Sequence, residues 1–163
     1  MYKVLHILWG GEIGIAQQYV KELVSDKSNK LIQHHIFLVT QEGGVLNNST
    51  VVGSPLMSAN CSKLNQINYC AERINTAILE WGIDLVHCHS TNVFVMNQLR
   101  LIEGCKIMMT DHGDIEKVKD NEFIIDSLWQ MHGQYLDKII LPSSDICRQF
   151  NKKYPGLSSQ ATY

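Results

Sequence analysis

Features that mark membrane-spanning, secreted and nucleic-acid-binding proteins are missing from this chain of 163 residues. No apolar stretch approaches the length of about 20 residues that a bilayer-spanning helix requires, so we expect no transmembrane segment. The first residues carry neither a basic segment nor a cleavage site, which favours a cytoplasmic protein over a secreted one. Acidic and basic residues nearly balance, with a net charge of -2 and a pI of about 6.4, so we expect no nucleic-acid partner. Peripheral association with a membrane surface stays open, although the scattered lysines do not argue for it.

The five cysteines contain no C-x-x-C pair, and five is an odd number. Both facts argue against a disulfide framework and a zinc knuckle, so we interpret the cysteines as reduced thiols. A G-x-G-x-x-G sequence is also missing after the first apolar run, which argues against a dinucleotide-dependent oxidoreductase.

Apolar runs and helical periodicities alternate along the chain, and hydrophobic residues make up 45% of it. This alternation is typical of repeated strand–helix units, which build a parallel sheet with helices on both faces. We therefore predict that residues 1–163 form a single α/β domain with a Rossmann-like, doubly wound, mostly parallel sheet. The expected strands are residues 3–9, 35–40, 83–89, 106–110 and 138–142, with weaker candidates at 51–52 and 55–57. The expected helices are residues 14–27, 67–81, 93–101 and 122–135, and one more after a cap at 143–145.

Gly10 and Gly11 follow the first apolar run and precede an amphipathic segment that starts near Gly14. This order predicts a strand, a glycine loop and the N-terminus of a helix. Such a junction is suited to an anion, because backbone N–H groups and the positive end of the helix dipole meet where no β-carbon blocks the approach. The alternative is that the glycines only supply a turn with positive φ. The sequence alone leaves both interpretations open.

Polar residues follow four of the expected strands. In an open parallel sheet, ligands bind outside the carboxyl ends of the strands, so these residues are candidates for a binding site. They are Gly10, Gly11 and Gly14 after the strand at 3–9, His89 and Ser90 at the end of the strand at 83–89, Asp111, His112 and Gly113 after the strand at 106–110, and Ser143 and Ser144 after the strand at 138–142.

His112 is the candidate for catalysis, because a histidine at a strand end can exchange protons near neutral pH. Asp111 and Asp114 are close enough in sequence to orient its ring. The alternative is a structural histidine whose ring bonds a loop carbonyl.

His87 and His89 are two residues apart, so both side chains face the same side of a strand while Cys88 faces the other. A zinc site would need a third or fourth ligand at suitable spacing, and none is obvious, so we predict no metal. We expect one of the two histidines to pack in the core and the other to line a cleft. Cys88 and Cys105 fit small core residues better than nucleophiles.

Taken in order, four segments resemble the N-terminal domain of family 4 glycosyltransferases of the GT-B fold. They are Lys3–Ile7 with the Gly10-Gly11 pair, Ile83–Ser90, Thr110–Gly113 and Asp137–Ser144. The resemblance implies a retaining transfer of a hexose-type sugar from a nucleotide diphosphate sugar to a carbohydrate or lipid-linked acceptor, with this domain on the acceptor side. It also implies that the glycine loop approaches the donor and that His112 lies beside the reacting sugar. The nucleotide sugar is then a substrate, and no cofactor is expected.

Two features depart from the family pattern. Residues 12–17 stand where a polar pair usually follows the glycines, which leaves open whether Gly11 or Gly14 approaches the donor. The C-terminal nucleotide-sugar-binding domain is absent from the 163 residues. A GT-B active site lies between two domains, so we expect this chain alone to be inactive. The alternative is a stand-alone Rossmann-like module that binds a phosphate or another protein without catalysis.

Overall fold

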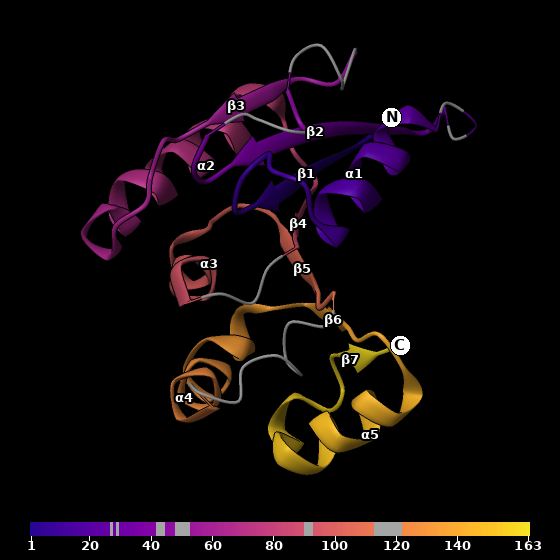
Figure 1. The fold of residues 1–163 in the computed structure, drawn as a ribbon, viewed down its shortest axis with the longest axis vertical. Helices are drawn as coiled ribbons and strands as arrows, with labels where there is room; N and C mark the ends of the chain where they lie inside the picture. The colour runs from indigo at the N-terminus through magenta and orange to yellow at the C-terminus, as the bar shows by residue number, and fades with distance from the viewer. Residues whose placement is uncertain (27, 29, 42–44, 48–52, 90–92, 113–121) are drawn as a thin grey trace.

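A parallel sheet runs through the centre of the computed structural model, which describes all residues except 27, 29, 42–44, 48–52, 90–92 and 113–121 (Figure 1). Within the described residues the sheet has seven strands in the order β3-β2-β1-β4-β5-β6-β7, and every pair of neighbours is parallel. The strands are β1 Tyr2–Leu8, β2 Ile32–Leu38, β3 Leu56–Ser58, β4 Leu85–Cys88, β5 Lys106–Thr110, β6 Lys138–Ile140 and β7 Ala161–Thr162. The predicted α/β, doubly wound, Rossmann-like class is confirmed.

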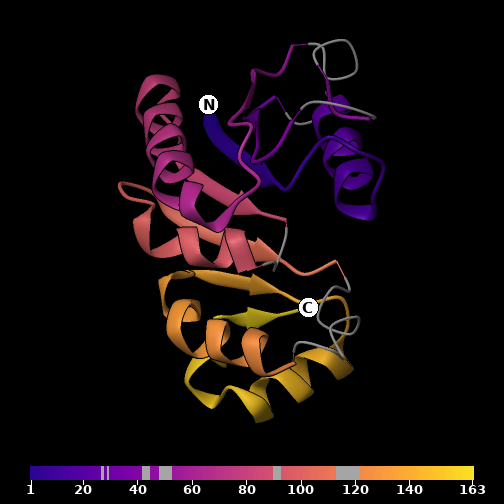
Figure 2. The ribbon, with the colours of Figure 1, turned by 60° about the vertical axis from the view of Figure 1, so that its left-hand side comes forward.

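Helices cover both faces of this sheet. The α-helices are α1 Ile15–Ser25, α2 Ile67–Trp81, α3 Val93–Gln98, α4 Glu122–His132 and α5 Ser144–Lys153. Short 3-10 turns extend four of them, at Leu64–Gln66, Leu99–Leu101, Gly133–Tyr135 and Pro155–Leu157. Helices α2, α3 and α4 line one face, while α1 lies on the other (Figures 1 and 2). None of the helices in the described part of the chain combines the length and hydropathy that a membrane-spanning helix needs.

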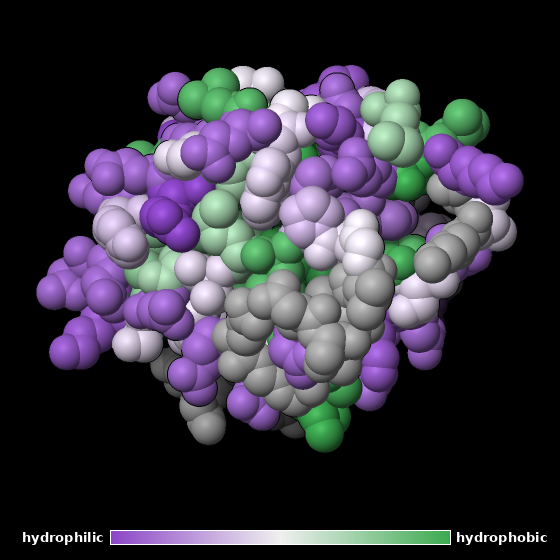
Figure 3. All heavy atoms as spheres, turned by 90° about the horizontal axis from the view of Figure 1, so that it is seen from above, coloured by the Kyte–Doolittle hydropathy of each residue, from purple (hydrophilic) through white to green (hydrophobic). Residues whose placement is uncertain are grey.

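Strand alternation divides the core into two clusters. Leu5 and Ile7 of β1 face a large cluster that includes α2, α3 and α4. Leu8 faces a smaller cluster in which Val20 of α1 packs against Ile36 and Leu38 of β2. The side chain of His6 shares the α1 face with Leu8, because it is two residues away on the same strand. On the described part of the face seen from above, hydrophobic side chains form separate groups among hydrophilic ones (Figure 3).

The ends of the helices and strands can be compared with those predicted from the sequence. Gly82 ends α2 in the left-handed conformation with φ 62°, as predicted for a C-terminal stop. The helix predicted over 122–135 ends as an α-helix at His132 and continues as a 3-10 turn. Strand β2 begins at Ile32, earlier than predicted, so His34 and His35 both belong to it. Strand β7 was not predicted, because two residues carry no readable period.

Candidate functional site

The order of the sheet reverses at β1, which pairs with β2 on one side and β4 on the other. Ligands of open α/β sheets bind at such a switch point, outside the carboxyl ends of the strands. His89 directly follows β4, and its N–H donates to the carbonyl of Ile7 near the end of β1 at 2.9 Å. Asp111 is buried directly after β5, where its N–H donates to the carbonyl of Ile140. The predicted residues at these ends therefore share one edge of the sheet.

The glycine loop is held by backbone contacts. The N–H of Gly11 donates to the carbonyl of Gln41 at 3.1 Å, and the carbonyl of Gly11 accepts from the N–H of Val45 at 3.0 Å. A β-carbon on Gly10 would lie 2.5 Å from the hydroxyl oxygen of Thr40, which itself donates to the carbonyl of Trp9. Gly10 is required by this close approach and not by its φ, since neither it nor Gly11 has a positive φ.

Gly14 occupies the N-cap position of α1 with an extended backbone, φ −165°. No side chain caps this helix end, and its first turn contains no acidic residue. The positive end of the helix dipole is therefore not neutralised by its own first turn. Gln17 of that turn reaches back and donates to the carbonyl of Gly10 at 3.0 Å. Because the Gly11 N–H is already bonded, this helix end offers the better placed donors for an anion.

A cavity of about 400 Å³ lies beside the loop, at the ends of β1, β2 and β3. Most of its lining surface is apolar, although several polar residues contribute to it. The lining includes Gly10, Gln17, Thr40, Gln41, Asn60 and Ser62. The loop and the start of α1 therefore form one wall of a hollow large enough for a sugar-sized group.

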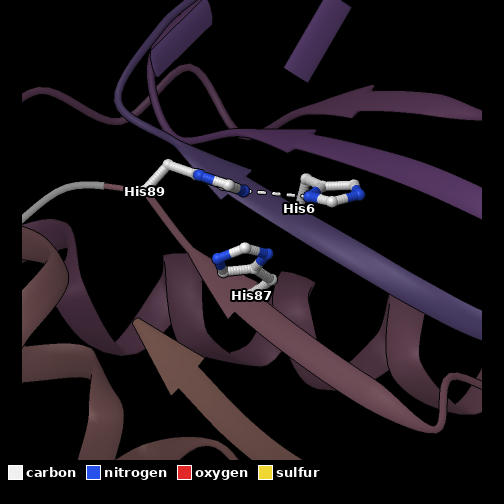
Figure 4. Close-up of side chains that lie close together, drawn as sticks. All are labelled: His6, His87 and His89. Atoms are coloured by element: carbon white, nitrogen blue, oxygen red, sulfur yellow. Dashed lines mark hydrogen bonds between the residues drawn. The ribbon is translucent and has the colours of Figure 1, made fainter. Parts of the chain in front are cut away.

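Four histidine rings form a continuous row across the α1 face of the sheet. The Nδ1 of His34 on β2 lies 2.8 Å from the Nε2 of His6 on β1. The Nδ1 of His6 lies 2.9 Å from the Nε2 of His89, and the Nδ1 of His89 lies 3.0 Å from the Nε2 of His112 (Figure 4 shows the His6–His89 contact). A fifth ring, His87, lies against His89 with ring centroids 3.9 Å apart and the ring planes tilted by 39°.

Burial keeps the inner rings of this row neutral. It lowers the pKa of His6 and of His89 well below the ordinary value of 6.5, and the neighbouring histidines lower both further. Burial also lowers the pKa of His87 to about 3. A neutral imidazole has one donor and one acceptor nitrogen, so each contact in the row joins an N–H to a lone pair.

The row changes one expectation from the sequence. One of His87 and His89 was expected to line the cleft, but their exposed fractions are only 4% and 2%. Tyr19 of α1 lies over His89 and His112, with ring centroids 5.8 and 5.4 Å away, and helps to cover them. The Nε2 of His112 lies 3.0 Å from the Nδ1 of His89.

The sequence analysis did not predict that His6 and His34 belong to this row. Strand parity would have placed His6 on the α1 face, but only the β1–β4 register sets it opposite His87. That register depends on pairing between distant segments, which local periodicity does not encode.

The remaining predicted residues divide into two groups. Ser143 is the N-cap of α5, where its hydroxyl accepts from the N–H of Ile146 at 3.2 Å, and Ser144 begins that helix. Ser90 and Gly113 lie outside the described residues. Ser143 was correctly predicted as a cap, and this bond gives its hydroxyl a structural role.

Comparison with known proteins places the fold. No family model and no curated protein matches the chain. Among solved structures, a glycosyltransferase from Rickettsia africae ESF-5 is similar with a TM-score of 0.69 and 13% identity, over 99% of this chain and 42% of that one. The lipopolysaccharide outer core galactosyltransferase WaaB is similar with a TM-score of 0.62 and 11% identity, over 99% and 44%. A UDP-N-acetylglucosamine 2-epimerase is similar with a TM-score of 0.65 and 14% identity, over 93% and 45%.

These likenesses show a shared fold. The chain spans less than half the length of each of the three structures, which agrees with the expected half of a GT-B fold. At 11–14% identity they carry no residue-level role to this chain.

Proposed function

We propose that this chain is the acceptor-side domain of a retaining glycosyltransferase of the hexosyl type. The donor would be a nucleotide diphosphate sugar, and the acceptor a carbohydrate or a lipid-linked group. The observation that carries the proposal is the position of His112, which lies at the carboxyl edge of the sheet next to the switch point and contacts the row of histidines through His89. The fold shared with parts of two glycosyltransferases supports it.

The chemistry needs donors where negative charge develops. Departure of a nucleoside diphosphate leaves an electron-poor sugar and a diphosphate that gains charge. The first turn of α1, uncapped by any side chain, offers N–H groups and a positive dipole for that charge. Gly14 has no β-carbon to block the approach. His112 would hydrogen-bond the reacting sugar while His89 holds its Nε2 in place.

The proposal requires a second domain that covers the cavity. The cavity beside Gly10 is partly open to solvent, and catalysis between charged groups requires that water be excluded. We therefore expect no measurable sugar transfer by the purified 163-residue chain. Transfer by that chain alone would contradict the requirement for a second domain.

The direct test of His112 uses the longest protein that the encoding gene specifies. His112→Ala should lower kcat/KM by about 100-fold or more, the usual contribution of a positioned acid, base or hydrogen-bond donor. His35→Phe is the control, because His35 is also a strand histidine but packs against Trp81 of α2 on the opposite side of the sheet. Unchanged turnover in His112→Ala would remove this residue from the mechanism.

A binding module without catalysis is the second candidate. Ile13 and Ile15, at the start of α1, are 78% and 64% exposed, and such side chains favour contact with another protein. Titration of the chain with nucleotide sugars separates the two candidates. Saturable binding that is weakened by a negative charge introduced near the helix end, such as Gln18→Glu, supports the transferase. Binding to a protein partner with no response to nucleotide sugars supports the module.

A further inference from the structure

Three histidine rings converge on one point between β1 and β4. His6 and His87 are opposite each other in the strand register, and His89 follows two residues later on the same face. One ring nitrogen from each of the three lies within 4.8 Å of the other two. Their exposed fractions are 1%, 4% and 2%, so the point is enclosed (Figure 4).

Each of these rings has an outer partner on its other nitrogen. The Nε2 of His6 contacts His34, the Nδ1 of His89 contacts His112, and the Nε2 of His87 lies 2.7 Å from the hydroxyl of Thr110. This is the arrangement found around metal-bound histidines, which donate their second N–H to a fixed acceptor. The inner nitrogens, Nδ1 of His6 and Nε2 of His89, point at one another across 2.9 Å.

We propose that His6, His87 and His89 bind a divalent transition-metal ion of the zinc type. Three neutral imidazoles suit zinc, nickel or copper, whereas magnesium and calcium require oxygen ligands. Zn–N bonds of about 2.0–2.1 Å in tetrahedral geometry place ligand nitrogens about 3.3 Å apart, so the His6–His89 pair needs to open by only a few tenths of an ångström. Three protein ligands leave one coordination position for a fourth ligand.

Metal binding has a definite effect on His112. When the Nε2 of His89 binds the metal, its Nδ1 must carry the hydrogen and donate to the Nε2 of His112. The Nε2 of His112 is then an acceptor, so a neutral His112 carries its own hydrogen on Nδ1. In the same way His6 donates to His34, and His87 donates to Thr110. The ion thereby joins β1 to β4 and selects one tautomer along the whole row.

The proposal is tested by metal binding, which requires no transferase activity. The chain is stripped with a chelator and titrated with Zn²⁺ by calorimetry, and with Co²⁺ by visible spectroscopy. We expect one ion per chain, Co²⁺ absorption bands typical of a site with nitrogen ligands, and a higher unfolding temperature with Zn²⁺. The absence of saturable uptake would overturn the proposal and leave the proposed function untouched.

Variants locate the site. His87→Gln and His89→Gln should each weaken binding by about 100-fold or more, and His34→Ala, which removes an outer partner, by about 10–100-fold. His35→Phe should bind as the parent does, because its ring packs on Trp81 with centroids 5.0 Å apart. Unchanged affinity in both glutamine variants places the ion elsewhere and overturns the assignment.

A sulfur substitution keeps the test decisive if a glutamine variant does not fold. In His87→Cys the thiolate replaces one imidazole, so the Co²⁺ complex should gain a sulfur-to-metal charge-transfer band in the near ultraviolet. Bound Co²⁺ without this band would show that residue 87 is not a ligand.

Discussion

His35 illustrates how one buried side chain sets a response to pH. It lies on β2 with an exposed fraction of 3%, packs against Trp81 of α2, and neither ring nitrogen has a hydrogen-bond partner. Burial, with smaller effects from Lys3 and His34, lowers its pKa from 6.5 to about 4. The unfolded chain therefore binds a proton at this residue more readily than the folded chain does.

The sign of the pH effect follows from that difference. Stability is retained above the unfolded pKa of 6.5 and falls as the pH decreases toward 4, because protonation favours the unfolded chain. His35→Phe removes this dependence while it keeps an aromatic ring against Trp81. Relative to its effect at neutral pH, it should gain about 2 kcal/mol of unfolding free energy at about pH 5. Urea unfolding at the two pH values measures this gain, and an equal effect of the substitution at both would contradict it.

Part of the candidate site could be predicted from residue types and their positions after strands. The contacts between its side chains depend on how distant strands pair, which the sequence pattern does not specify. His89 and His112 were placed correctly at one edge, because polar residues after parallel strands share an edge. Their direct contact, and the arrival of His34, depended on how strands 23 or more residues apart align. The role of His112 in catalysis stays a prediction.

Helix α5 shows how a single hydroxyl starts an element. Ser143 accepts from the N–H of Ile146, Asp145 lies in the first turn, and Lys152 and Lys153 lie in the last. These charges complement the helix dipole at both ends. The helix also anchors α4, since Phe150 meets Trp129 edge to face with centroids 4.9 Å apart.

Loss of the cap should destabilise the protein measurably. Ser143→Ala leaves an N–H of the first turn without its acceptor and should cost about 1 kcal/mol. Ser144→Ala is the matched control, because Ser144 lies inside the helix, where alanine is favoured. Chemical denaturation of both variants measures the difference, and equal stability would show that water replaces the hydroxyl at no cost.

Elements with strong periodicity were predicted closely, and short ones were not. The helix at 67–81 matches α2 at both ends, because an apolar stripe and Gly82 define it locally. Strand β3 lies one residue beyond its candidate at 55–57, and β7 was missed. Strands this short are held by the neighbouring strand, whose position the local sequence does not specify.

At the scale of the whole molecule, the solvent exposure of the cysteines shows how well the core is shielded from solvent. The structure has no disulfide among them: Cys61, Cys70, Cys88 and Cys147 are buried, and Cys105 is half-buried. Burial raises the pKa of Cys70 and of Cys88 to about 12, so both remain thiols. Cys88 is buried in the core as expected, whereas Cys105, for which the same was expected, is only half-buried.

A thiol-reactive reagent should therefore distinguish the folded chain from the unfolded one. Thiolate is the reactive form, and a buried thiol is protected twice, by its raised pKa and by its surroundings. We expect Ellman's reagent to label no more than one of the five cysteines, Cys105, before unfolding, and all five in denaturant. Rapid labelling of two or more in the native chain would show that the core opens.

The central position of β1 has a consequence for folding during synthesis. During synthesis β1 can pair early with β2, but its other edge must wait for β4, 81 residues later at the level of Lys3 and Asp84. Until then the nascent chain exposes an unpaired strand edge, which is prone to pair with other chains. Closing such a distant contact also slows folding. The pairing of β1 with β4, which brings the histidines together, is thus the last strand pairing to form during synthesis of the first half of the sheet.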